Sequence, residues 1–131
     1  MQEKQLQLVT YEQAKKLKEL GFNWECYCHY TYLATKPILE NGKYWNSNRC
    51  ADYECKYSAP TVALALKWFR DVKGIVNGIK RENIDDCDLI EYCGHFNDMY
   101  ITDFTYTYYE EAESALLDAL LEHCEQEVKN A

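Results

Sequence analysis

The stretch TYYEEAESALLDALLEHCEQEV, Thr107–Val128, says more about the fold than any other part of this sequence. Its start, Thr107 to Glu110, has the pattern of a capping box, in which two side chains satisfy free amides of a helix's first turn. Apolar side chains then recur at helical spacing, and they comprise Ala112, Ala115, Leu116, Leu117, Ala119, Leu120, Leu121, Cys124 and Val128. Such a wide stripe exceeds what packing on one sheet requires. We expect either a second helix or a homodimer partner to cover the surplus.

Two further helices are expected earlier in the chain. The segment TYEQAKKLKELGF, Thr10–Phe22, opens on a capping box and ends at Gly21, where a left-handed residue closes the helix. The segment APTVALALKWFR, Ala59–Arg70, carries Pro60 in its first turn, where a missing N–H does no harm, and Gly74 follows its end. Apolar residues recur on one face of each segment, which is typical of helices packed on a sheet.

Period-two alternation predicts strands at Trp24–Leu33, Lys43–Asn46, Ile75–Ile79, Asp88–Cys93 and Met99–Tyr106. Asn41–Gly42 has the pattern of a hairpin turn, and Pro37 is expected to end the strand before it. The expected fold is therefore α+β, an antiparallel sheet of about four strands with helices packed on it, in the order α-β-β-α-β-β-α. We expect residues 1–131 to form a single domain.

Composition excludes several classes of protein. The 131 residues are 47% hydrophobic and 27% charged, which is typical of a folded globular protein and argues against disorder. No secretory signal follows Met1, and no apolar run approaches the roughly 20 residues of a membrane span. We therefore expect a cytoplasmic protein without membrane contact. The formal net charge of −8 makes direct nucleic-acid binding unfavourable for the chain as a whole.

The charges are strongly polarised along the chain. Residues 1–81 hold eight acidic and thirteen basic residues, whereas residues 82–131 hold fourteen acidic residues and a single base, Lys129. The exclusion of nucleic acid therefore applies firmly to the second segment and leaves the first open, because that segment holds Lys15, Lys16, Lys18 and Arg49. An acidic face can keep a protein soluble, pair with the chain's own basic part, or present a phosphate-like surface to a basic partner.

A partner-binding surface is the candidate site that these charges support. A basic groove that normally holds nucleic acid is the kind of protein partner that such a surface would fit. Tyrosine suits protein contacts because its rigid, amphipathic ring loses little entropy on binding, and the chain holds twelve tyrosines. The candidate residues are Glu111, Asp118, Glu122, Glu125, Glu127, Tyr100 and Tyr106.

Catalytic and cofactor motifs are absent from the sequence. It contains no P-loop, no G-x-G-x-x-G, no G-x-S-x-G and no H-E-x-x-H. Cys93 and His95 could form a nucleophilic pair, but their acidic surroundings would raise the thiol pKa, so we expect no enzyme and no cofactor. Spacing disfavours zinc, since Cys50 and Cys55 just fit a zinc knuckle and Cys87 and Cys93 do not. We therefore expect the cysteine thiols to serve as small buried hydrophobic groups.

Three segments, Thr10–Phe22, Ala59–Arg70 and Thr107–Glu122, resemble in wording and order a group of short uncharacterised proteins from prophages and other mobile elements of gut anaerobic bacteria. The resemblance implies a shared fold and brings no catalytic or ligand-binding residues with it. We therefore expect a non-catalytic protein of this type that binds another macromolecule. The most specific version of this expectation is a protein that inhibits a host defence protein. The alternative is a small-ligand-binding protein with an aromatic pocket between sheet and helices.

Overall fold

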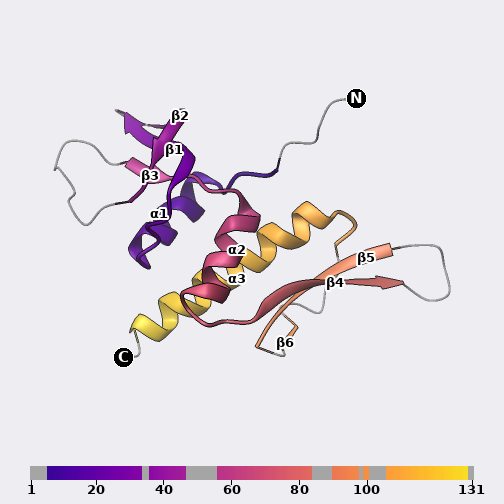
Figure 1. Cartoon of the computed structure of the whole chain (residues 1–131). Helices are drawn as coiled ribbons and strands as arrows, with labels where there is room; N and C mark the ends of the chain where they lie inside the picture. The colour runs from indigo at the N-terminus through magenta and orange to yellow at the C-terminus, as the bar shows by residue number, and fades with distance from the viewer. Residues whose placement is uncertain are drawn as a thin grey trace, which may run out of the picture. The chain divides into compact units, whose positions relative to one another are not determined.

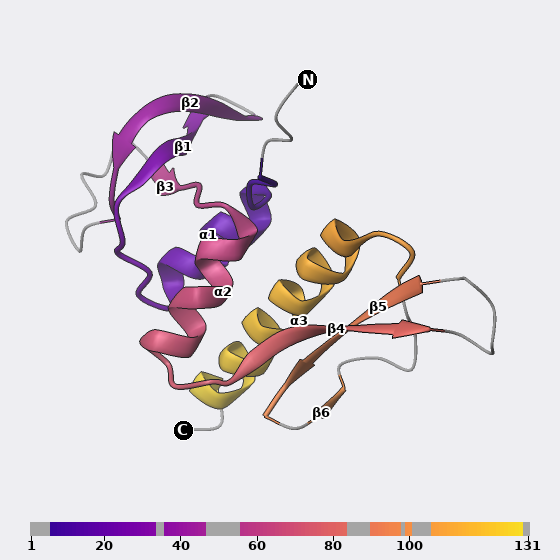
Figure 2. The ribbon, with the colours of Figure 1, turned by 45° about the vertical axis from the view of Figure 1, so that its right-hand side comes forward.

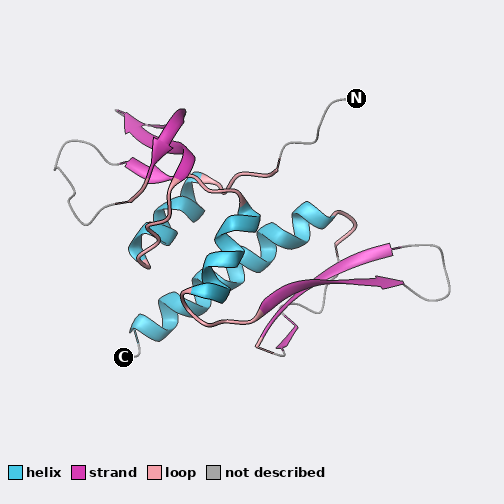
Figure 3. Ribbon diagram, in the orientation of Figure 1, coloured by secondary structure: helices cyan, strands magenta, loops and turns pink. Residues whose placement is uncertain are grey.

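The computed structural model describes residues 6–33, 36–46, 56–83, 90–97, 99–100 and 106–129. Within these ranges the chain forms three helices and six strands (Figure 1, Figure 3). The chain divides into two compact units, residues 1–61 and 62–131, and each is treated by itself. The single domain expected from the length of the chain stays a prediction.

The first unit consists of one helix and one antiparallel sheet. Helix α1 spans Tyr11–Glu19, and the strands are β1 (Cys26–Leu33), β2 (Lys36–Tyr44) and β3 (Lys56–Ser58). The strand order is β2-β1-β3, so β1 is central and pairs antiparallel with both neighbours. The core residues of this unit, each at most 3% exposed, include Val9, Ala14, Leu17, Phe22, Cys26 and Ala59.

Both ends of α1 are closed as the sequence predicts. At its start, Thr10 Oγ1 accepts a hydrogen bond from the Gln13 amide (3.2 Å), and Gln13 Oε1 accepts one from the Thr10 amide (2.9 Å). This reciprocal pair is a complete capping box. At the other end, Gly21 adopts φ +99°, and the Phe22 amide donates to the Leu17 carbonyl (3.0 Å). The left-handed residue thus lets Phe22 fold back into the core, where it has no exposed surface.

The β1–β2 hairpin turns at a different place from the one predicted. Leu33 pairs with Lys36, so the Asn41–Gly42 pair lies inside β2 instead of forming the turn. Gly42 takes φ +141° where the β1–β2 register shifts, which fits the backbone of a β-bulge. Pro37 does not end a strand, because β2 is an edge strand and one of its sides needs no ladder hydrogen bonds.

The second unit contains two helices and a second antiparallel sheet. Its helices are α2 (Val62–Asp71) and α3 (Tyr109–Lys129), and its strands are β4 (Asn77–Asn83), β5 (Ile90–Phe96) and β6 (Met99–Tyr100). β5 is the central strand in the order β4-β5-β6, and it also forms a bridge through Tyr92 to Tyr106. The long antiparallel pairing of β4 with β5 was not expected from the sequence.

Helix α3 is the centre of the second unit. It lies between α2 on one side and the β4–β5 strands on the other (Figure 2). Four of its leucines have no exposed surface, namely Leu116, Leu117, Leu120 and Leu121. A second helix therefore accounts for the wide apolar stripe, which is one of the two alternatives that the sequence leaves open, and a homodimer stays a prediction. The helix begins at Tyr109, one residue later than the capping pattern at Thr107 predicts.

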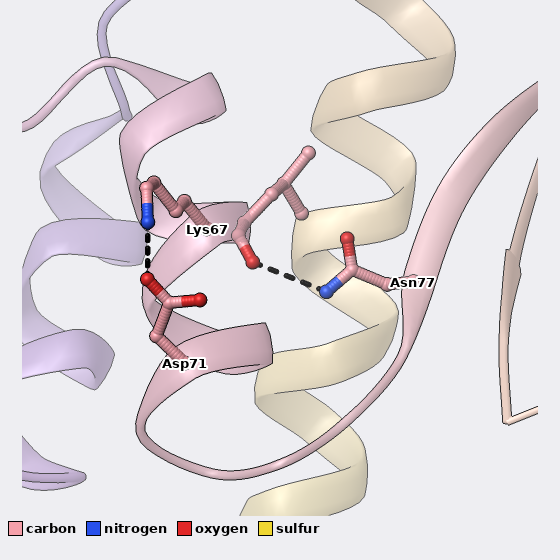
Figure 4. A network of polar contacts seen from close by, with 4 residues as sticks. Lys67, Asp71 and Asn77 are labelled. Atoms are coloured by element: carbon pink, nitrogen blue, oxygen red, sulfur yellow. Dashed lines mark hydrogen bonds and ion pairs between the residues drawn. The ribbon is translucent and has the colours of Figure 1, made fainter.

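Asn77 holds the turn from α2 into β4 (Figure 4). Its Nδ2 donates to the carbonyl oxygen of Leu66 (3.1 Å), the bond drawn from Asn77 in Figure 4. It also donates to the carbonyl oxygen of Ile75 (3.2 Å). Its Oδ1 accepts a hydrogen bond from the Arg70 guanidinium (3.0 Å). Because Asn77 is only 7% exposed, its amide needs these partners to be buried without a large loss of free energy. The side chain thereby fixes where β4 begins relative to α2.

The α+β class, the antiparallel pairing and the order of the helices and strands are confirmed. The structure refines the prediction, because the six strands of the described residues form two three-stranded sheets rather than one sheet of about four strands. Two of them, β3 and β6, are three and two residues long, which is too short for period-two alternation to be recognised. In the part of the chain that the structure describes, no helix is long and apolar enough to cross a membrane.

Candidate partner-binding surface

Helix α3 presents a row of carboxylates to solvent. Those at positions 111, 118, 122 and 125 are separated by seven, four and three residues, so they lie within about 60° of one another around the helix axis. The buried leucines occupy the opposite side of the helix. Glu111, Asp118 and Glu122 are exposed and Glu125 is half-buried. We call these four residues the acidic stripe.

The charge density of the acidic stripe is lower than that of a single DNA strand but of the same order. With a helical rise of about 1.5 Å per residue, the stripe extends over roughly 21 Å from Glu111 to Glu125. One strand of duplex DNA carries a phosphate about every 3.4 Å, or about six phosphates over that length. Four carboxylates therefore supply about two-thirds of the charge of one DNA strand.

Little basic charge offsets the acidic stripe within its own unit. Residues 62–131 hold fifteen acidic and six basic residues, whereas residues 1–61 hold seven acidic and eight basic residues. The net charges are −9 and +1, so the acidic excess lies in the second unit and the first is nearly neutral. Among the described residues, no ion pair engages Glu111, Glu122 or Glu125. Lys129, at the end of α3, is the only lysine or arginine of that helix.

Glu127 does not join the acidic stripe. It lies five residues beyond Glu122, which places it about 140° further around the helix. Its Oε1 is 3.2 Å from His123 Nε2, and the His123 ring packs against Phe96 of β5 with centroids 5.2 Å apart. Grouping by charge alone put Glu127 with the other carboxylates, because it ignored the angle around the helix.

The two candidate tyrosines lie outside α3. Tyr106 is half-buried and exchanges two backbone hydrogen bonds with Tyr92, each 2.8 Å long. Tyr100 ends β6, where its backbone pairs with His95, and its side chain lies outside what the structure describes. Tyr109, in the first turn of α3, is 44% exposed and packs edge-on against Tyr92 at 5.5 Å. It shares the angle of Glu127 around the helix and so lies away from the acidic stripe.

The thiol of Cys93 lacks the electrostatics of a nucleophile. Burial raises its pKa, the Glu82 carboxylate raises that pKa further, and Lys80 opposes the shift. The direction agrees with the expectation from the acidic surroundings, although burial is the larger cause. Burial also raises the pKa of the Cys124 thiol, and it raises that of Cys26 to about 11. These thiols are protonated at neutral pH and pack as small apolar groups.

The described side chains form no cluster that could hold a metal ion. Within the described ranges, no three His, Cys, Asp or Glu side chains come together to hold a metal ion. Cys50, Cys55 and Cys87 lie outside those ranges, so the zinc prediction is untested there. Trp68 and Phe69 are at most 1% exposed and pack edge-to-face at 5.1 Å, so they fill the core of the second unit.

Comparison with known proteins leaves function to be argued from the molecule itself. The chain matches no protein-family model, no curated protein and no solved structure. The resemblance to proteins of mobile elements stays a prediction. What the chain can bind must therefore be inferred from the charge, exposure and chemistry of its surfaces.

A second surface, in the first unit, lies outside the candidate residues named from the sequence. Tyr11 at the start of α1 contacts Tyr30 and Tyr32 of β1 and Tyr57 of β3, with ring centroids 5.8, 5.9 and 5.6 Å apart. We call these four residues the tyrosine cluster. Lys18 Nζ lies 4.9 Å from the centre of the Tyr57 ring, within the range of a cation–π interaction. The seven-residue spacing of Tyr11 and Lys18 was a usable signal, whereas the strand partners depend on pairing that the sequence did not reveal.

Proposed function

We propose that this chain is a non-catalytic binding protein whose acidic stripe docks in the basic, nucleic-acid-binding groove of a protein partner. The observation that carries the proposal is the stripe itself, four carboxylates along one side of a helix in a unit of net charge −9. In keeping with the sequence resemblance, we place the protein in the cytoplasm and assign it to the phage or mobile-element type. Inhibition of a host defence protein is the role that such docking would serve.

The packing of α3 supports this function because it makes the acidic stripe rigid. The helix is buried on two sides, by α2 and by the β4–β5 strands, so its backbone is already ordered before any partner arrives. Preorganised groups lose less conformational entropy on binding than flexible ones. A row of like charges also steers a basic partner toward the stripe during diffusion, and this effect weakens as salt is added.

Charge reversal on the stripe tests the proposal. The variant Glu122→Lys/Glu125→Lys reverses two carboxylates of the stripe, and the control Glu12→Lys/Glu19→Lys makes the same change of charge on exposed positions of α1. Each variant, and the wild-type chain, is immobilised and exposed to a nuclease-treated bacterial lysate. The retained nucleic-acid-binding proteins are then quantified by mass spectrometry.

The stripe variant should retain about tenfold less of the basic partner, and the control should stay within about twofold of wild type. Raising the salt from about 50 mM to about 200 mM should weaken wild-type retention by about tenfold. If both double variants lost the same share of the retained partner, retention would depend on net charge alone and the proposal would be overturned.

Glu127 provides a second control on the same helix. The variant Glu127→Lys changes the charge of α3 without touching the acidic stripe, because its side chain lies toward His123. We expect its retention of the partner to stay within about twofold of wild type. A loss as large as that caused by reversing Glu122 and Glu125 would mean that the angular arrangement of the carboxylates does not matter.

A further inference from the structure

The tyrosine cluster lies on one face of the first unit's sheet. Tyr30 pairs with Leu39 on one side and with Tyr57 on the other, and Tyr32 pairs with Pro37. Paired residues point to the same face of a sheet, and so do residues two apart on one strand. This face therefore carries three tyrosines beside an aliphatic and a proline side chain.

Helix α1 leaves part of this face open to solvent. Tyr11 stacks on Tyr32 with 23° between the ring planes, and it meets the Tyr30 and Tyr57 rings edge-on. Even so, Tyr32 is 42% exposed and its neighbour on the face, Leu39, is 45% exposed. An aromatic ring that is supported by packing and still reachable from solvent is what a nucleic-acid base requires for stacking.

Hydrogen bonds hold the tyrosine cluster in place. The Tyr30 hydroxyl donates to the Val9 carbonyl (2.8 Å), and the Lys18 ammonium donates to the Lys56 carbonyl (2.9 Å). Burial raises the pKa of the Tyr30 hydroxyl, so it remains a protonated donor at neutral pH. The platform is thus ordered before a ligand arrives, which lowers the entropy lost on binding.

Lysines border the tyrosine cluster. Lys15 and Lys18 follow Tyr11 by four and seven residues, so they share its side of α1, and Lys15 is exposed. The described residues of the first unit hold six lysines and four glutamates. Two of those glutamates have ion-pair partners, since Glu25 lies 3.9 Å from Lys43 and Glu40 lies 3.8 Å from His29. The other two, Glu12 and Glu19, are exposed on α1. The cluster therefore combines ring faces for bases with ammonium groups for phosphates.

We propose that the tyrosine cluster binds single-stranded nucleic acid, with a base stacked at Tyr32 and the flanking phosphates held by Lys15 and Lys18. Duplex nucleic acid fits less well, because its base faces are already stacked and hidden. A proline-rich peptide is the competing occupant, since it docks on aromatic grooves, but it offers no phosphate to the lysines. This site lies in the first unit, and its test is independent of the acidic stripe.

Fluorescence anisotropy of the full chain with dye-labelled oligonucleotides tests the proposal. The probes are 12-nucleotide oligo(dT) and oligo(rU), which separate DNA from RNA, and a duplex of the same length, at about 50 mM salt. Two variants probe the site, Tyr32→Ala for stacking and Lys15→Glu for phosphate contact. Their matched controls are Tyr27→Ala, which removes a 76% exposed tyrosine outside the cluster, and Lys43→Glu, which makes the same charge change elsewhere.

Saturable binding of at least one single-stranded probe is expected, about tenfold tighter than binding of the duplex. Tyr32→Ala and Lys15→Glu should each weaken binding about tenfold, and the two controls should stay within about twofold of wild type. Circular dichroism checks that each variant folds. If Tyr32→Ala fails to fold, the binding measured for Lys15→Glu tests the site alone, because Lys15 is exposed. A dye-labelled proline-rich decapeptide serves as a fourth probe. The proposal is overturned if neither single strand binds, if only the decapeptide binds, or if the control variants lose as much affinity as the site variants.

Discussion

Replacing Asn77 tests whether its side chain holds the second unit together at the α2–β4 turn. The variant Asn77→Ala removes three hydrogen bonds of 3.0–3.2 Å in a site that is 7% exposed. A typical intramolecular hydrogen bond contributes about 0.5–1.5 kcal/mol net, so the expected loss of unfolding free energy is about 1.5–4.5 kcal/mol. The size of this loss distinguishes a structural anchor from an ordinary turn residue.

The isosteric variant Asn77→Asp sharpens the test. Aspartate keeps the acceptor that faces Arg70, but it replaces the amide donors by oxygens that face the carbonyls of Leu66 and Ile75. The new ion pair contributes little, because Arg70 is exposed. Asn77→Asp should therefore be at least as destabilising as Asn77→Ala, whereas side-chain volume alone would make it the milder change.

Urea unfolding followed by far-UV circular dichroism measures these differences at neutral pH. The control is Asn41→Ala, which removes the same side chain from an exposed position of β2 and should change the unfolding free energy by less than about 0.5 kcal/mol. An Asn77→Asp variant as stable as wild type, with an unchanged denaturant slope, would refute the reasoning, because the two donated hydrogen bonds would then contribute nothing.

Three further predictions follow from burial and charge. Leu120→Ala should lower the unfolding free energy by about 2.7–5 kcal/mol, whereas Leu6→Ala, at a 69% exposed position, should leave it within about 0.5 kcal/mol in the same urea experiment. Because burial raises the Cys26 pKa to about 11, iodoacetamide at mildly alkaline pH should label Cys26 well after Cys28, as read by mass spectrometry; equal rates would contradict the burial. Burial also raises the pKa of the Glu113 carboxyl, so the folded state binds a proton more readily than the unfolded state, and stability falls as pH rises through that window. Glu113→Gln should therefore stabilise the protein at neutral pH, and denaturation at several pH values should show the gain vanishing below the ordinary pKa of 4.5.

The helices could be predicted from the sequence because their signals are local. The Thr10–Gln13 capping box and the closing Gly21 lie within one or two turns of the residues they act on, and the structure reproduces both. The wide apolar stripe of α3 correctly predicted that more than one surface covers this helix. Which surfaces cover it could not be read from the stripe, because that depends on elements far away in the chain.

Strand pairing was harder to predict because register is not a local property. The Asn41–Gly42 pair fits a hairpin turn and a bulge equally well, and only the pairing of Leu33 with Lys36 decides between them. The short strands β3 and β6 carry no alternation of their own and are defined by their neighbours. Tertiary context therefore determined the parts of both sheets that local patterns left ambiguous.

The candidate surfaces show the same contrast between local signals, which the sequence reveals, and contacts between distant segments, which it does not. Charge counting found most of the acidic stripe, since one helix carries all of it and helical spacing places its members together. Glu127 lies at a different angle around α3, which charge counting does not consider, and its part in partner binding stays a prediction. The tyrosine cluster joins Tyr11, two residues of β1 and Tyr57, so it exists only once helix and strands have packed.

Competition with DNA tests most directly whether the acidic stripe occupies a nucleic-acid-binding groove. A dye-labelled full chain is bound to the purified partner recovered from the lysate, and a 20-base-pair duplex is titrated into the complex while anisotropy reports the bound chain. We predict complete release of the chain, with half-release at a duplex concentration set by the partner's affinities for the duplex and for the chain. A ternary complex that holds both chain and duplex at saturation would contradict the proposed function.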